Sequence, residues 1–196
     1  MPRLRYIEED EIGPAARELM EYAERTGTPD KRVVSIFTRT ETGSWVMDAW
    51  IKLCFEGVLP NRLKEMCRIR ISELHHCGYC STVRSKVAQA EGLTEEMIAE
   101  LWNFETSDQF SAREKAALRL ATKFKESDDA IDDDALFDEL KVHFSEEEII
   151  ELGLLCALTD GLGKFTRAIN LVTWAEACEI NPSLRERGDA LAVAKP

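Results

Sequence analysis

The chain has 196 residues, of which 44% are hydrophobic and 32% charged, and its formal net charge is −12 at pH 7. This composition is typical of a soluble globular protein and predicts one domain over residues 1–196. The negative charge argues against nucleic acid or an anionic membrane as a main partner. The N-terminal residues contain no apolar leader, and no apolar run reaches the length of a membrane span. We therefore expect a cytoplasmic protein.

Helical periodicity dominates the chain, with little strand-like alternation. The first part predicts helices over 11–24, 31–38, 44–55 and 60–75, then one that begins at Cys77 and ends near Gly92. The second part predicts helices over 94–103, 111–125, 145–160 and 164–179, with a break or a bend at 161–163. The tail from Arg187 is expected to fray. These elements predict an all-α fold.

The most informative motif is the pair Cys77 and Cys80, which stands where a helix is expected to begin. Their spacing allows a disulfide within the first helical turn, where free N–H groups and the helix dipole stabilise a thiolate. The motif therefore predicts a redox-active dithiol. The other four cysteines lie in less distinctive surroundings: Cys54, Cys156 and Cys178 are expected in the core, and Cys67 in the core or a pocket.

The stretch 59–100 resembles the alkylhydroperoxidase-D and carboxymuconolactone decarboxylase family. The resemblance depends on Leu59 to Glu65, on Cys77-Gly78-Tyr79-Cys80, and on the helix break Gly92-Leu93-Thr94. In that family a Glu stands twelve residues before the first Cys, as Glu65 does here. Residues 145–171 also look like the family's last helices, so the resemblance covers about 45–175. It implies a single-domain helical bundle and a homo-oligomer, which we expect to be a trimer or a hexamer.

The resemblance also implies a chemistry. Cys80 would attack the O–O bond of a peroxide, Cys77 would resolve the sulfenic acid into a disulfide, and an external dithiol would restore both thiols. Members with a proton relay carry a His four residues after the second Cys, where this chain has Arg84. Arg stays protonated and cannot relay a proton, but it can hold a thiolate by charge. We therefore expect a Glu65–Arg84 ion pair beside Cys80.

Two histidines directly precede the motif. His75 or His76 could supply the missing acid–base function, or both could simply be helix-end residues that the dipole favours. Zinc bound by Cys77, Cys80 and a nearby His is a further alternative, although no second Cys pair exists to complete a structural site.

Other polar residues have a functional and a plain interpretation. Glu65 could belong to the site or could pair with Arg62 or Arg68 as an ordinary surface carboxylate. Arg68 and Arg70 are expected at solvated or salt-bridged positions. Arg167 and Asn170 could line the same pocket as the cysteines.

Three functions remain open at this point. The leading hypothesis is a thiol-dependent oxidoreductase that reduces peroxides or disulfides, without metal, flavin or nicotinamide, since no phosphate-binding glycine motif is present. The alternatives are a lyase that decarboxylates a small lactone, and a non-catalytic oligomeric protein that binds a ligand or senses redox state. Large aromatic residues on several helices also favour a homo-oligomer; they are Trp45, Trp50, Phe55, Trp102 and Trp174.

Overall fold

The computed structural model describes residues 2–126 and 128–185, and the helices found there confirm the all-α fold. No β-strand occurs in these two ranges. The bounds of the longer helices are α1 Pro14–Thr26, α3 Glu41–Phe55, α4 Asn61–Leu74, α8 Ala112–Lys123, α10 Asp134–His143 and α11 Glu146–Ala168. Shorter helices are α2 Lys31–Phe37, α5 Gly78–Thr82, α6 Lys86–Ala90, α7 Glu95–Glu100, α9 Asp128–Ile131 and α12 Trp174–Ile180, with 3₁₀ turns at Glu9–Glu11 and Leu101–Asn103.

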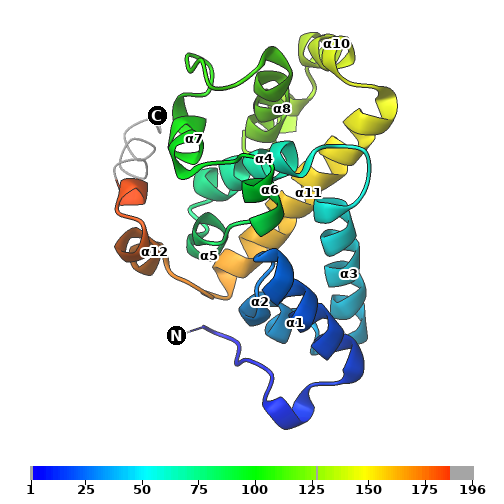
Figure 1. The fold of residues 1–196 in the computed structure, drawn as a ribbon, viewed down its shortest axis with the longest axis vertical. Helices are drawn as coiled ribbons and strands as arrows, with labels where there is room; N and C mark the ends of the chain where they lie inside the picture. The colour runs from blue at the N-terminus through cyan, green and yellow to red at the C-terminus, as the bar shows by residue number, and fades with distance from the viewer. Residues whose placement is uncertain (1, 127, 186–196) are drawn as a thin grey trace.

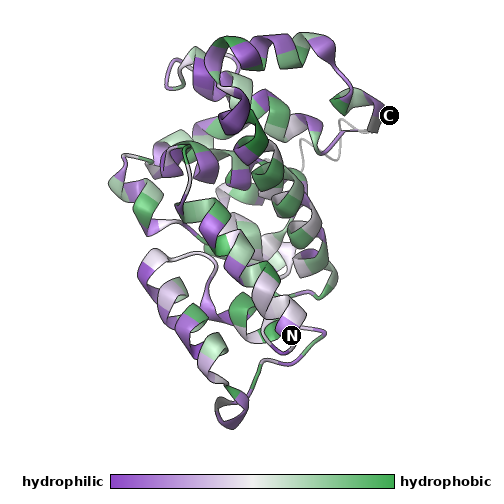
Figure 2. Cartoon of the chain, turned by 90° about the vertical axis from the view of Figure 1, so that its right-hand side faces the viewer, coloured by the Kyte–Doolittle hydropathy of each residue, from purple (hydrophilic) through white to green (hydrophobic). Residues whose placement is uncertain are grey.

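Helix α4 is the central element, and it packs against α8 and α11 as well as the short helices α5 and α6 (Figure 1). Every residue from Leu63 to Glu73 is buried, although five of them carry charge. The main hydrophobic cluster surrounds α4 with residues of α3, α8, α10 and α11. A second cluster joins α2, the Cys-x-x-Cys segment and α12. Hydrophobic and hydrophilic residues alternate along the outer helices (Figure 2).

Helix starts agree well with the cap signals in the sequence. Ser111 and Ser145 form capping boxes with Glu114 and Glu148, and Thr94 caps α7. The sequence also indicated that a helix begins at the Cys pair, and Cys77 is the N-cap of α5.

The expected break at residues 161–163 is wrong, because α11 runs without interruption to Ala168. Two glycines cost an exposed helix only about 1 kcal/mol each, which packing against α4 and α3 can offset. Gly163 also has a packing reason, since a Cβ there would lie 3.1 Å from Nδ1 of His75. The chain turns later, at Asn170 with φ 58°, before Thr173 caps α12.

No helix in the described ranges combines the length and the apolar character that a membrane crossing needs. The expected fraying from Arg187 concerns residues outside those ranges. Among the five aromatic residues noted above, Trp50 is buried and only Trp45 is largely exposed, at 62%. The single chain thus covers most of this aromatic surface by itself.

Candidate active site

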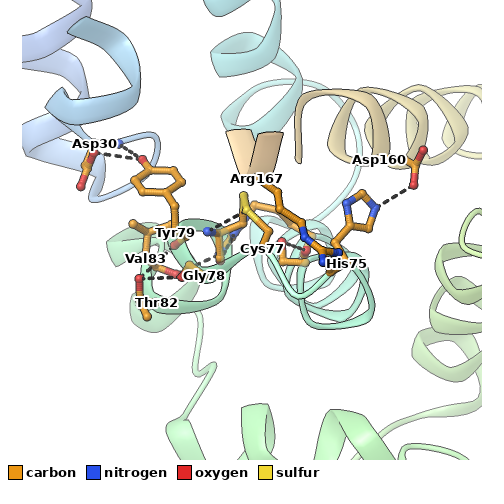
Figure 3. Close-up of a disulfide and its surroundings, with 12 residues drawn as sticks. Asp30, His75, Cys77, Gly78, Tyr79, Thr82, Val83, Asp160 and Arg167 are labelled. Carbon is orange, nitrogen blue, oxygen red and sulfur yellow. Dashed lines mark hydrogen bonds and ion pairs between the residues drawn. A yellow bond between two sulfur atoms is a disulfide. The ribbon is translucent and has the colours of Figure 1, made fainter. Parts of the chain in front are cut away.

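The two motif cysteines are paired in a disulfide at the start of α5, with their Cα atoms 5.3 Å apart (Figure 3). Cys77 is fully buried, whereas Cys80 is partly exposed. The backbone N–H of Cys80 donates to Cys77 Sγ at 3.3 Å, so the helix start provides a donor for this sulfur. The two cysteines are therefore unequal, because only Cys80 can meet a small molecule directly.

Helix α5 ends at Thr82, which corrects the expected helix through Gly92. Val83 is extended, and Ser85 then caps α6 through its bond to the N–H of Ala88 at 3.1 Å. The break leaves the backbone carbonyls of Cys80 and Val83 without helical partners, and the Arg68 side chain of α4 donates hydrogen bonds to both. As a result, Cys77, Cys80 and Arg84 do not share one helical face.

Cys80 faces a cavity that α2, α3, α4, α5 and α11 build together. The volume of this cavity is about 40 Å³, which is room for roughly three waters. Its walls are mostly apolar, with Val33, Phe37, Met47, Trp50 and Leu162 among the lining residues. Within the described part of the chain, Arg68 is the only charged side chain that lines it, and Ser72, Tyr79, Thr159 and Thr166 add hydroxyl groups.

Arg68 is the buried cation of this site, with 3% of its surface exposed. Its guanidinium forms a fork with Glu65, at 2.6 and 2.8 Å, and donates to the carbonyls of Cys80 at 2.7 Å and Val83 at 2.9 Å. Burial lowers the Arg68 pKa, but the Glu65 carboxylate outweighs it and the pKa is raised. Arg68 therefore keeps its charge next to the backbone of the dithiol.

Glu65 is 5% exposed and has a second partner, because its Oε1 accepts the N–H of Ser85 at 2.9 Å. One carboxylate thus joins α4 to the start of α6 and orients Arg68. The sequence left the pairing of Glu65 with Arg68 open, but Arg68 itself was expected at an ordinary position. Its i, i+3 spacing from Glu65 on a helix was the available signal.

The expected Glu65–Arg84 ion pair is wrong. Arg84 pairs instead with Glu95, at 2.9 Å, and donates to the Ser81 carbonyl at 2.7 Å. It does not line the cavity. The physical reason is the end of α5 at Thr82, which turns residue 84 away from the cysteine side and toward α7.

His75 lies at the C-terminal end of α4 and points toward α11 rather than toward the disulfide (Figure 3). Its Nε2 is 2.7 Å from Asp160 Oδ1, and its buried Nδ1 has no hydrogen-bond partner within the described ranges. Gly163, whose missing side chain leaves room for this ring, also lines the cavity. His75 therefore lies behind the cavity wall formed by Gly163 and does not itself line the cavity.

His76 adopts a left-handed backbone with φ 52° and stacks on Trp174, with the ring centroids 4.6 Å apart. Arg167 does not line the cavity; it donates to the His75 carbonyl at 2.5 Å and so satisfies the end of α4. Asn170 is the turn residue after α11 and is not part of the cavity wall either.

Tyr79, between the two cysteines, is buried and fixes α5 to the start of α2. Its hydroxyl donates to Asp30 Oδ1 at 3.0 Å and accepts the Asp30 N–H at 2.8 Å (Figure 3). Burial, together with the Asp30 carboxylate, raises the Tyr79 pKa, so the phenol stays neutral. Gly78 beside it lies so close to the backbone of Val172 and Thr173 that any side chain would collide.

The remaining cysteines are buried and outside the cavity, as expected for Cys54, Cys156 and Cys178; for Cys67 the sequence had left the core and the pocket open. Burial raises the pKa of Cys67 to about 12 and raises those of Cys54 and Cys156 as well. These three thiols therefore stay protonated and unreactive. Nowhere in residues 2–126 and 128–185 do three or more His, Cys, Asp or Glu side chains gather as a metal site would require.

His75 is expected to make stability depend on pH. Burial, then Lys125 and Lys164, lower its pKa from 6.5 to about 4, against the opposing effect of Asp160. As the pH falls below 6.5 the unfolded chain binds a proton before the folded chain does, so stability is lost progressively toward pH 4. The loss should reach at most about 3 kcal/mol.

Urea unfolding of the wild type and of His75→Gln at several pH values measures this contribution. The free energy of unfolding of the variant should fall less between pH 6.5 and 4. Equal slopes for the two proteins would contradict the role of His75.

Comparison with known proteins relates the segment that carries these residues to one family. Residues 41–123 match the carboxymuconolactone decarboxylase family, and this segment contains α4, the cysteine pair, Glu65 and Arg68. This segment of the chain is therefore similar to that family.

A curated relative is the uncharacterized protein YdfG of Bacillus subtilis (strain 168), 26% identical over 122 residues, which are 62% of this chain and 83% of that protein.

Solved structures share the fold. The debrominase Bmp8 superposes with a TM-score of 0.74 at 19% identity, over 91% of this chain and 96% of Bmp8. A cysteine-to-alanine variant of Bmp8, solved in complex with 2,3,4-tribromopyrrole, gives a TM-score of 0.71 over 95% of both chains, again at 19% identity. The Agrobacterium tumefaciens protein ATU0492, of unknown function and suggested to be the antioxidant defence protein AhpD, gives 0.59 at 20% identity, over 66% of this chain and 88% of that protein.

Proposed function

We propose that the protein is a thiol-dependent oxidoreductase that reduces small hydroperoxides through Cys77 and Cys80. The main support for this proposal is that the two cysteines differ in exposure: Cys80 lines the cavity, whereas Cys77 is fully buried one helical turn away. Arg68, which lines the same cavity, supplies a fixed positive charge for the Cys80 thiolate. The roles of attacking and resolving thiol are part of this proposal.

In the first step the Cys80 thiolate attacks one peroxide oxygen and the O–O bond breaks. Cys80 becomes a sulfenic acid, and the alkoxide or hydroxide that leaves takes a proton to form an alcohol or water. The Cys77 thiolate then attacks the Cys80 sulfur, which forms the disulfide and releases water after protonation. An external dithiol reduces the disulfide by exchange and is itself oxidised.

Arg68, not Arg84, carries the electrostatic role in this scheme. The guanidinium remains protonated, so it stabilises the thiolate and transfers no proton. Glu65 positions Arg68 through their two-point ion pair. The mostly apolar walls lower the local dielectric constant, which strengthens the attraction between thiolate and guanidinium.

A second candidate is reductive dehalogenation of a small ring. The fold matches the debrominase Bmp8 over nearly the whole chain, and the cavity wall contains the aromatic rings of Phe37, Trp50 and Tyr79. Here the two thiols would supply two electrons, so that a carbon–bromine bond becomes a carbon–hydrogen bond with release of bromide and formation of the disulfide. The cavity would have to widen to admit a brominated pyrrole.

The test is a thiol count on the reduced protein before and after one equivalent of hydrogen peroxide, the smallest hydroperoxide, which fits the cavity without widening it. We expect the loss of two thiols, no mass adduct, and recovery of both thiols with dithiothreitol. A parallel reaction with 2,3,4-tribromopyrrole, followed by bromide release, separates the second candidate from the first. An unchanged thiol count with the hydroperoxide would reject the peroxidase and favour a lyase or a binding protein.

A further inference from the structure

One face of α11 carries an apolar stripe that nothing in the described structure covers. The α11 stripe consists of Ile150, Leu154, Ala157, Gly161, Phe165 and Ala168, which are all exposed. Ile150 is 63%, Leu154 54% and Phe165 48% exposed. Their spacing of three and four residues places them on a single side of the helix, opposite the side that buries Leu152, Leu155 and Cys156.

The stripe is self-complementary when two copies of α11 lie antiparallel. A two-fold axis between Ala157 and Leu158 would bring Ile150 of one copy to Phe165 of the second. It would also bring Leu154 of one copy to Gly161 of the other, where the absence of a side chain leaves room for the leucine. Small residues near the axis let the two backbones approach closely.

Charge at the helix ends favours the same orientation. The first turn of α11 carries the exposed acids Glu146 and Glu147. Its other end carries Lys164, and Arg3 donates to the Ala168 carbonyl at 2.8 Å. In an antiparallel pair each acidic end faces a basic end, and the two helix dipoles also oppose each other.

The stripe also reaches the candidate active site. Phe165 packs edge-on against Phe37, with ring centroids 5.5 Å apart at 79°, and Phe37 lines the cavity. A second copy that buries Phe165 would therefore support the outer side of the cavity wall.

We propose that the α11 stripe is a two-fold interface with a second copy of this chain. Such an interface uses the same patch on both copies. The protein is then a dimer or an assembly of dimers, so a hexamer remains compatible and a plain trimer does not. The proposal is independent of the reaction at Cys80.

Light scattering after size exclusion tests the proposal on the full chain. The wild type should show a mass that is an even multiple of 22.2 kDa. Ile150→Lys should raise the dissociation constant of the two-fold contact by about a hundredfold or more. Ile180→Lys is the matched control, since Ile180 is also 63% exposed but lies on α12, and it should leave the mass unchanged. A wild type of one or three chain masses, or an assembly that Ile150→Lys leaves intact, overturns the interface.

A charge pair tests the antiparallel register. Leu154→Glu should separate the copies, and adding Gly161→Lys on the same chain should restore the assembly, because residue 154 of one copy faces 161 of the other. Nothing lies within 4 Å of a Cβ built on Gly161, so the lysine is tolerated. Circular dichroism verifies that the variants keep their helices. If Leu154→Glu separates the copies and the added Gly161→Lys does not restore the assembly, the two-fold arrangement is rejected.

Discussion

Cys80→Ser is expected to reduce hydroperoxide consumption by about a thousandfold or more, because a serine hydroxyl is not ionised near neutral pH and attacks peroxides poorly. Cys77→Ser should act differently. Cys80 would still react, but no thiol one turn away could resolve the product, so the enzyme would stop after one turnover as a sulfenic acid. Dimedone labelling followed by mass spectrometry measures this state.

The buried position of Cys77 provides the control for this assignment. Cys80→Ser leaves Cys77 without access to the cavity, and we expect no dimedone adduct on it. Cys67→Ser, which removes a buried thiol outside the cavity, should leave turnover unchanged. An adduct on Cys77 in the Cys80→Ser variant would reverse the roles of the two thiols.

Arg68→Met is expected to lower the free energy of unfolding by about 3–5 kcal/mol, because it leaves Glu65 buried without its partner. It also removes the donors to the Cys80 and Val83 carbonyls. In the reduced protein, alkylation of Cys80 at neutral pH should slow, since the thiolate loses its nearby positive charge. Urea unfolding and iodoacetamide kinetics measure the two effects separately.

Arg119→Met is the matched control, since Arg119 pairs with Glu105 and Glu139 at a position that is only partly buried, and it should cost about 1 kcal/mol or less. Arg68→Lys retains the charge and loses the two-point geometry, so it should recover alkylation more than stability. Arg84→Ala should leave alkylation near wild type, because Arg84 pairs with Glu95. If Arg84→Ala slowed the alkylation of Cys80 and Arg68→Met did not, the electrostatic role would belong to Arg84 instead of Arg68.

Local sequence patterns predicted the elements that depend on local forces. Side-chain caps such as Ser111 and Ser145 satisfy free N–H groups within their own first turn, so their signal does not depend on the rest of the chain. The same holds for Cys77 and Cys80, whose three-residue spacing is enough for a disulfide within one turn. The buried positions of Cys54, Cys156 and Cys178 were likewise evident from their apolar surroundings in sequence.

Patterns were misleading where a distant partner changed the local preference. Gly161 and Gly163 weaken a helix in isolation, but α11 continues through them because it packs on α4 and because His75 occupies the space beside Gly163. Conversely, the residues after Thr82 have helical propensity, yet the helix ends there. Arg68 from α4 takes up the carbonyls of Cys80 and Val83, and Glu65 takes up the N–H of Ser85.

The sequence by itself therefore determined the all-α class, most helix starts and the dithiol, because short-range hydrogen bonds and covalent spacing govern these features. Only the tertiary structure decided which cation stands beside Cys80. Arg84 is four residues from Cys80 in sequence, but the end of α5 turns it toward Glu95. Arg68 is twelve residues away and reaches the Cys80 carbonyl because α4 packs against α5. A buried charge needs partners from several segments, and only folding brings those segments together.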